Sequence, residues 1–335
     1  MAAKWEPKNK NILITGAASG LGAAYAEALL KEGAQNIAVL DIDVKTGENF
    51  VSKLNETYNN KAIFIKCDVS KEEDIKNSFN IVLNTFKRID LLINNAGKNI
   101  AVLDIDVKTG ENFVSKLNET YNNKAIFIKC DVSKEEDIKN SFNNVLNKFK
   151  RIDLLINNAG IMSDTDSMWR LACDVNWQGL VSFTMKAVKH MRKDEGGEGG
   201  TIVNISSTAG ICKLNFLPIY CGSKGAVLHF SQSLASAPFY DNTGIRVLTL
   251  CPGPTATKLM EGLDNRIVET TDMNQLQSLN GIPVQSVESA VAAMMKLLKD
   301  GDSGSIWLSA NDKPVVELTP QINKYLAELE KLTLP

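Results

Sequence analysis

The chain has 335 residues, and its 37 lysine and arginine side chains nearly balance 39 aspartate and glutamate side chains. This balance, without a dense basic run, argues against nucleic acid as a partner. Apolar residues make up 44% of the chain, which argues against disorder. No apolar stretch reaches the roughly 18 residues of a membrane span, so no membrane partner is expected. The polar residues 1–10 lack the apolar segment of a signal peptide, so we expect a cytoplasmic protein.

An internal tandem duplication occupies segments 36–98 and 99–161. Between 36–97 and 99–160 only two pairs of aligned positions differ, namely Ile81 against Asn144 and Thr85 against Lys148. Removing one copy leaves a chain of normal length for one α/β domain. We therefore expect a single domain over residues 1–335 that carries an internal duplication.

The predicted elements alternate between short buried strands and helices along the chain. In the first part they are a strand at 11–14, a helix at 23–31, a strand at 36–40, a helix at 45–58, a strand at 62–66, a helix at 71–86 and a strand at 90–94. After the second copy come a helix at 169–192, a strand at 201–205, a helix at 220–236, a strand at 246–250, a helix at 287–298 and a last strand at 305–308. This alternation predicts an α/β fold with a doubly wound parallel sheet of the Rossmann type. Ligands bind such sheets at the carboxyl ends of the strands.

A glycine-rich turn and an acid follow the first two predicted strands. The turn Thr15-Gly16-x-x-x-Gly20-x-Gly22 lets the backbone approach a pyrophosphate, although taken alone it also fits an ordinary tight turn. Asp41 follows the turn at the end of the second predicted strand, where a carboxylate can bind the adenosine ribose hydroxyls and repel a 2′-phosphate. No lysine or arginine lies in the turn or next to Asp41, so the sequence favours NAD over NADP. Asp104 is the copy of Asp41.

Three further side chains have the spacing of an acid–base site. Tyr220 and Lys224 stand at i and i+4 of a predicted helix, so the phenol and the ammonium share one face. A nearby cation lowers the pKa of a phenol, which can then exchange a proton with an alcohol or a ketone. Ser207 follows the predicted strand that precedes this helix, so its hydroxyl can hold the substrate oxygen at the strand end.

Taken together, these motifs resemble the short-chain dehydrogenase/reductase family over nearly the whole chain. The resemblance implies catalytic roles for Ser207, Tyr220 and Lys224, with Asn176 completing a proton relay through a water. It also implies a set of cofactor-binding residues, some of them inside the duplication. These are Thr15, Gly16, Ser19, Gly20, Leu21, Gly22, Asp41, Asp68, Asp131, Asn157, Ala159, Gly160, Tyr220, Lys224, Pro252, Gly253, Thr255 and Thr257. The Asn-Asn-Ala-Gly element also occurs at residues 94–97.

The 36–41 strand and the 304–308 end resemble the insect-type alcohol dehydrogenase branch, which is itself similar to NAD-dependent hydroxyprostaglandin dehydrogenases. The expected reaction is an NAD-dependent interconversion of a secondary alcohol and its ketone. An apolar substrate would suit a pocket walled by Leu214, Phe216, Leu217, Leu259 and Met260, with residues 258–283 as its lid. The resemblance further implies a homodimer or homotetramer. The alternative is a catalytically impaired or non-enzymatic binding or storage protein on the same fold.

No zinc site or other metal site is expected, because the chain has no CxxC pair and two histidines, His190 and His229. Because of the duplication, each site residue inside it has two candidate positions, one in each copy. Loop closure favours Asp41 from the first copy and Asn157 from the second, whereas Asp68 and Asp131 stay equal candidates for the acid that contacts adenine. The surplus copy could be exposed, could lengthen the sheet, or could come from gene assembly.

Overall fold

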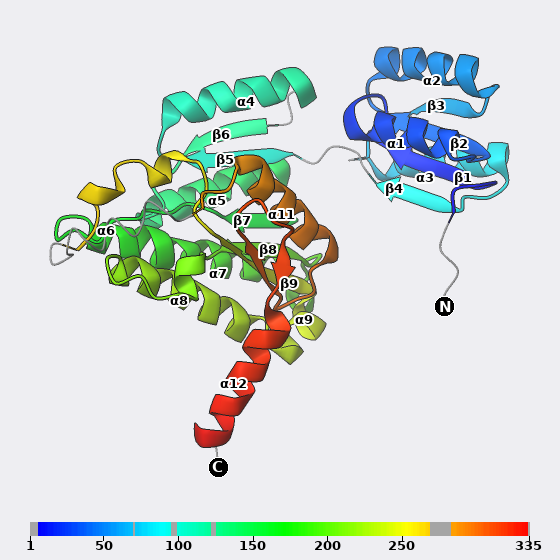
Figure 1. Ribbon diagram of the computed structural model, residues 1–335. Helices are drawn as coiled ribbons and strands as arrows, with labels where there is room; N and C mark the ends of the chain where they lie inside the picture. The colour runs from blue at the N-terminus through cyan, green and yellow to red at the C-terminus, as the bar shows by residue number, and fades with distance from the viewer. Residues whose placement is uncertain (1–5, 70, 95–98, 122–124, 269–282, 334–335) are drawn as a thin grey trace. The chain divides into compact units, whose positions relative to one another are not determined.

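The computed structural model describes residues 6–69, 71–94, 99–121, 125–268 and 283–333 (Figure 1). The chain divides into two compact units, which we describe separately: Met1–Val102 with Lys108–Phe127, and Leu103–Val107 with Ile128–Pro335. Both contain parallel strands connected by helices, as an α/β fold requires. The single domain expected over the whole chain stays a prediction.

The first unit contains a four-stranded parallel sheet in the order β3-β2-β1-β4. Its strands are β1 (Asn11–Thr15), β2 (Asn36–Asp41), β3 (Ala62–Lys66) and β4 (Leu91–Asn94). The helices between them are α1 (Gly20–Lys31), α2 (Val44–Tyr58) and α3 (Glu72–Phe86). Because β1 lies between two neighbours and is covered on both faces, every one of its residues is buried.

Alternate side chains of β1 enter two cores on opposite faces of this sheet. Ile12 and Ile14 pack in a cluster with Leu30 of α1. Leu13 packs instead in a cluster with Val82 of α3. The period of two along a strand produces this division, and it fixes the register of β1. The carboxyl end of β1 therefore leads directly into the glycine-rich turn at a set place beside β2.

The second unit contains a five-stranded sheet in the order β11-β10-β9-β8-β7, parallel except for the antiparallel edge strand β11. Its strands are β7 (Leu154–Asn157), β8 (Gly200–Ile205), β9 (Ile245–Pro252), β10 (Ile306–Ser309) and β11 (Val316–Glu317). Its longer helices are α5 (Glu135–Phe149), α7 (Leu180–Met191), α8 (Pro218–Leu234) and α11 (Val287–Asp300). Two apolar clusters hold Ile202 and Val203 of β8, one with α5 and α7 and the other with α11.

One helical segment before α7 has an irregular backbone. Helix α6 (Trp169–Cys173) continues into a π-helical turn at Asp174–Gly179 and then into α7. The sequence predicts a single helix at 169–192, and the structure agrees except for this turn. Single π-turns inside helices often occur at functional sites. This one contains Asn176.

Both copies of the duplicated segment fold into matching elements. The second copy contributes β5 (Ile100–Asp104), α4 (Val107–Tyr121) and β6 (Ala125–Lys129) besides α5 and β7. β5 and β6 form a two-stranded sheet of their own, whereas β2 and β3 belong to the four-stranded sheet. Within the described residues β5 and β6 do not pair with β3, so the alternative in which the surplus copy lengthens the sheet beside its third strand is not what the structure shows.

The C-terminal part departs from the sequence prediction. The strand expected at 305–308 is not the last element, because β11 and α12 (Thr319–Thr333) follow it. Most side chains of α12 are exposed, including Tyr325 and Leu332. Across the described ranges, none of the helices combines the length and the apolar character that a bilayer crossing needs.

Candidate active site

Two glycines of the glycine-rich turn in the first unit adopt a left-handed backbone. Gly16 and Gly20 both adopt positive φ angles, 60° and 58°, which side chains with a Cβ rarely adopt. Helix α1 starts at Gly20 after Ser19, whose side chain makes no capping hydrogen bond, and its first turn contains no acidic residue. A helix N-terminus of this kind suits a phosphate group. The turn therefore fits the pyrophosphate of a dinucleotide.

Asp41 lies against this turn. Its carboxylate accepts a hydrogen bond from the backbone N–H of Ala18 at 3.0 Å and from that of Asp43 at 3.1 Å. Its copy Asp104 accepts from Asp106 at 2.9 Å and is exposed at the end of β5. The acid beside the glycine-rich turn is thus Asp41, as loop closure predicts.

Asp68 and Asp131 have similar local surroundings in the two copies. Asp68 pairs with Lys71 at 3.9 Å, and Asp131 pairs with Lys134 at 3.2 Å. Hydrogen bonds from Ser133 hold the pKa of Asp131 below its usual value. Each carboxylate thus pairs with the lysine three residues after it.

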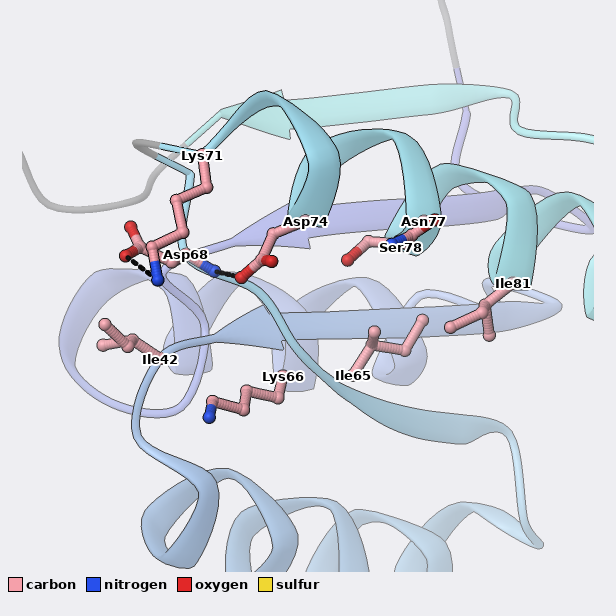
Figure 2. A pocket seen from close by; sticks show the side chains of 9 residues that line it. All are labelled: Ile42, Ile65, Lys66, Asp68, Lys71, Asp74, Asn77, Ser78 and Ile81. Atoms are coloured by element: carbon pink, nitrogen blue, oxygen red, sulfur yellow. Dashed lines mark hydrogen bonds and ion pairs between the residues drawn. The ribbon is translucent and has the colours of Figure 1, made fainter.

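Asp68 also lines an open cavity of about 380 Å³ in the first unit. Figure 2 shows Asp68 and Lys71 beside Asp74, Ser78 and other residues of α3, with Ile42, Ile65 and Lys66 on the opposite side. The remaining lining residues are Asn77 and Ile81. Ile81 is one of the two positions at which the copies differ, so the hollow has an apolar side chain where the second copy has Asn144.

Tyr220 lies in the first turn of α8 and is only 6% exposed. Burial raises the pKa of its phenol, and a hydrogen bond with the Ser207 side chain lowers it in part. Ser207 follows β8 and caps a short helical turn, where its Oγ accepts from the N–H of Ala209 at 3.1 Å. The structure thus brings together two of the three side chains that the sequence proposes for acid–base chemistry.

Lys224 stands one helical turn after Tyr220, and its Nζ lies 5.9 Å from the centroid of the tyrosine ring. The ammonium donates to the backbone carbonyl of Ile205 at 3.0 Å. Burial lowers the pKa of Lys224 to about 8. The sequence predicts that Lys224 depresses the pKa of Tyr220. The structure does not show that effect, because burial dominates the pKa of the phenol and raises it.

Asn176 and Gly160 lie beside Lys224. The Asn176 side chain is held by the backbone of Ile161, accepting at 2.7 Å and donating at 2.8 Å, and it also donates to Ser223 at 3.2 Å. A Cβ added at Gly160 would lie 3.5 Å from both Asn176 Oδ1 and Lys224 Nζ. Glycine at this position therefore keeps the space next to the ammonium open.

Asn157 is the last residue of β7. Its amide donates to Thr184 Oγ1 at 3.0 Å and to Asn204 Oδ1 at 2.9 Å, which ties β7 to α7 and β8. Ala159 follows in the same loop. The first-copy element at residues 94–97 lies outside the described residues from position 95 onward.

The loop that begins at Pro252 leaves the carboxyl end of β9. Gly253 donates to the carbonyl of Ser309 at 2.7 Å, and Thr255 Oγ1 donates to the carbonyl of Gly253 at 2.9 Å. The fully buried Gln285 donates to Thr255 Oγ1 at 3.0 Å, whereas Thr257 bonds back to Thr255. Gln285 was not predicted, because its partners come from loops distant in the sequence.

The apolar side chains proposed as a pocket wall do gather around Tyr220. Phe216 and Leu217 are buried in one cluster with the tyrosine, and Leu214, Leu259 and Met260 pack against it. The structure adds Met162, Ala209, Cys221, Leu263 and Ile267 to this cluster. The predicted lid is described only as far as residue 268 and again from residue 283, and residues 269–282 lie outside the described residues.

Asp164 is a further buried residue next to Tyr220 that the sequence analysis missed. It is 3% exposed, and its carboxylate accepts from the backbone N–H groups of Ile219 at 2.6 Å and Tyr220 at 2.9 Å. One sequence signal could have found it. Helix α8 begins at Pro218 after Leu217, so no local side chain can cap it, and an acceptor from elsewhere is needed.

Comparison with known proteins agrees with this architecture. The family model described as short chain dehydrogenase matches residues 10–101 and 97–268. The chain is 33% identical over 182 residues to rat (Rattus norvegicus) 15-hydroxyprostaglandin dehydrogenase (NAD(+)), covering 52% of this chain and 68% of the relative. It is also 33% identical over 199 residues to alcohol dehydrogenase 1 of Ceratitis cosyra, covering 59% of this chain and 76% of that protein. A crystal structure of levodione reductase aligns over 91% of this chain and 97% of its own, with 21% identity and a TM-score of 0.46.

Parallel strands joined by helices, with a glycine-rich turn after the first strand, define an α/β fold of the Rossmann type. Given the family match, the chain belongs to the short-chain dehydrogenase/reductase family, in the branch of the hydroxyprostaglandin and insect alcohol dehydrogenases. The resemblance drawn from the motifs is confirmed. The relatives are oxidoreductases that act on small molecules.

Proposed function

We propose that the protein is an NAD-dependent alcohol dehydrogenase that interconverts a secondary, apolar alcohol and its ketone. The observation that carries this proposal is the buried Tyr220 phenol, with the Ser207 hydroxyl bonded to it and the Lys224 ammonium one helical turn away. A buried phenol between a hydroxyl and a cation suits proton exchange with a substrate oxygen. The names of the relatives support the same reaction class.

NAD is the cofactor that the residues fit. The positive φ angles of Gly16 and Gly20 and the open start of α1 suit a pyrophosphate, while the Asp41 carboxylate beside the turn disfavours a 2′-phosphate. We assign Thr15 at the end of β1, Ser19 before α1, and Leu21 and Gly22 in its first turn to the same cofactor site. NAD accepts the hydride that the alcohol carbon loses.

In this proposal, side chains of the protein bind the alcohol oxygen and remove the hydroxyl proton. Ser207 Oγ donates a hydrogen bond to the alcohol oxygen, and Tyr220 as phenolate removes the hydroxyl proton. Below about pH 8, where Lys224 is protonated, its ammonium can stabilise the negative charge that develops on Tyr220 as the proton moves. Asn176, fixed by Ile161 and Ser223, lies beside the ammonium and is placed to hold a water that passes the proton outward.

The substrate class follows from the cluster around Tyr220. Leu214, Leu259, Met260, Leu263 and Ile267 are only partly buried, so their exposed surfaces are available to an apolar group. Residues 258–268 and Phe216 then enclose the alcohol carbon and exclude water. An aliphatic or aromatic secondary alcohol would bury its apolar part here.

The test is a panel of secondary alcohols and their ketones, each assayed with NAD and with NADP by absorbance of the reduced nicotinamide. Wild-type turnover with NAD that disappears in Tyr220→Phe supports the proposal. Absence of turnover on the whole panel, with NADH binding retained by fluorescence, would favour a binding or storage protein instead.

Further parts of the proposal are a cytoplasmic location, a single working domain and assembly into a homodimer or homotetramer. The six cysteines are all free thiols, which fits a reducing compartment. Sedimentation of the purified protein tests the assembly state.

A further inference from the structure

Asp164 is a buried carboxylate, and its surroundings disfavour its charged form. Its side chain is 3% exposed, and within the described residues its carboxylate bonds to backbone N–H groups and forms no ion pair with a lysine or an arginine. Burying a carboxylate without a cation is costly, and burial accordingly raises the pKa of Asp164. A neutral serine or asparagine can cap a helix at lower cost. Asp164 differs from such a cap because it accepts two backbone N–H groups at once.

The two oxygens of this carboxylate fix the start of the helix that contains Tyr220. Pro218 has no N–H, so the first donors of α8 are those of Ile219 and Tyr220. Asp164 accepts both, one with each oxygen. An anion at the N-terminus of a helix is further stabilised by the aligned peptide dipoles. The backbone of Tyr220 is therefore held directly, rather than through the rest of α8.

The backbone of the same residue holds the described part of the predicted lid, residues 258–268. The N–H of Asp164 donates to the carbonyl of Arg266 at 2.8 Å. The Arg266 guanidinium in turn donates to the carbonyls of Leu259 at 3.1 Å and Gly262 at 3.3 Å. One residue thus sets the position of the phenol and, through Arg266, the position of one apolar wall of the site.

We propose that Asp164 is a positioning residue that holds Tyr220 and the 258–268 segment in one fixed arrangement around the substrate. The proposal rests on the function proposed above, in which Tyr220 removes the alcohol proton. Misplacement of a reacting group by about 1 Å costs up to roughly a hundredfold in rate. Loss of Asp164 should therefore lower kcat far more than it changes the binding of NAD.

The experiment compares Asp164→Ala and Asp164→Asn with a matched pair of controls. Asp312 also accepts the N–H of a residue at the start of a helix, Ser286 before α11, and its hydrogen bonds go to Ser286 rather than to Tyr220 or to residues 258–268. The probe is 2-octanol with NAD, and its 2-deuterated form gives the isotope effect on kcat. Thermal unfolding and circular dichroism report whether each variant folds.

We expect Asp164→Ala to lower kcat roughly 10- to 100-fold and to increase the isotope effect, with the KM for NAD within about twofold of wild type. Asp164→Asn should be intermediate, because its single amide oxygen can accept one of the two N–H groups. Asp312→Ala and Asp312→Asn should leave kcat and the isotope effect unchanged. If Asp164→Ala fails to fold, the isosteric Asp164→Asn decides on the same criteria.

The outcomes separate the inference from the function on which it rests. An Asp164 variant with wild-type kcat and isotope effect, in a protein that Tyr220→Phe inactivates, overturns the inference alone. A wild-type protein without turnover on 2-octanol or the alcohol panel, or a Tyr220→Phe variant that stays active, overturns the proposed function and the inference with it. Equal losses of kcat in the Asp164 and Asp312 variants would reduce Asp164 to a structural cap.

Discussion

The Nζ atom of Lys224 lies 5.9 Å from the centroid of the Tyr220 ring, and both side chains are less than a tenth exposed. Burial shifts the pKa values of the two groups in opposite directions. Burial raises the pKa of the phenol and lowers that of the ammonium, so each group is driven toward its neutral form. A phenol and an amine that both titrate in the alkaline range form a site whose chemistry depends strongly on pH.

Replacement of the phenol is the most direct test of this site. Tyr220→Phe removes the group that exchanges the proton while retaining the ring that packs against Phe216 and Leu217. General acid–base catalysis contributes about 10²- to 10⁴-fold, so we expect a loss of kcat of at least that size. NADH binding, measured by fluorescence, should be unchanged. Residual activity above a tenth of wild type would contradict the role of Tyr220.

The pH profile should reflect the ionisation of the same phenol. Alcohol oxidation needs the phenolate, so kcat/KM for oxidation should rise with pH through the alkaline range, while ketone reduction falls. The hydrogen bond with Ser207 lowers the pKa of Tyr220, so Ser207→Ala should move the midpoint of both profiles to higher pH. A midpoint that stays in place or moves to lower pH would show that another group controls the profile.

Lys224 should make stability depend on pH in a definite direction. Its pKa falls from 10.5 to about 8 on folding, so below pH 8 the native state bears the full cost of a buried ammonium. Between these values the unfolded state binds more protons, so stability rises with pH. The shift corresponds to about 3 kcal/mol. We expect Lys224→Met to be most favourable relative to wild type near pH 7 and to lose this advantage by pH 10.

Urea unfolding at pH 7, 8.5 and 10 measures this difference. Lys189 on α7 is exposed, so Lys189→Met is the matched control and should show no comparable trend. A Lys224→Met difference that is flat with pH would mean that the ammonium is not buried in solution.

Cofactor choice can be tested with a control that the duplication supplies. Asp41→Asn keeps an acceptor for the N–H of Ala18 but removes the negative charge beside the glycine-rich turn. Two like charges about 4 Å apart repel by about 1 kcal/mol or more, so kcat/KM with NADP relative to NAD should rise about fivefold or more. Asp104→Asn makes the same change in the same local sequence, where the carboxylate accepts from Asp106, and should leave the ratio unaltered. An equal response of both variants would contradict the assignment of Asp41.

Removal of one copy tests the single-domain prediction. Deletion of segment 36–98 joins Gln35 to Asn99, which restores the local sequence at Gln35–Asn36. The shortened chain contains each predicted motif once. Its single Leu-Leu-Ile-Asn strand can pair with β1 in the register that β4 has, and with β8 in the register that β7 has. We expect it to fold, to unfold in a single calorimetric transition and to keep at least the specific activity of the full chain. An inactive or aggregated deletion variant, with an active full-length protein, would show that both copies are needed.

Local signals were enough for much of the fold and for the core of the site. The spacing of the glycines indicated where the turn lies, and the i to i+4 spacing placed Lys224 one helical turn after Tyr220 because α8 is helical. The apolar wall gathered as predicted because its residues flank Tyr220 in the sequence or in the loop after β9.

Other features depend on contacts that no local pattern contains. Asp164 and Gln285 act on α8 and on the Thr255 loop from distant segments, so their roles appear only in three dimensions. The π-turn around Asn176 has the composition of an ordinary helix. The depressed pKa of Lys224 comes from burial that the alternation of polar and apolar residues does not indicate.

The strands β4 and β7 have the same sequence, yet β4 pairs with β1 while β7 pairs with β8. Strand propensity measured in one host mixes intrinsic preference with the contribution of neighbouring strands. Here one peptide occurs twice in a single molecule, under the same solvent and temperature, with different partners. Paired substitutions at Ile93 and Ile156 would therefore separate the two contributions without any change of host protein.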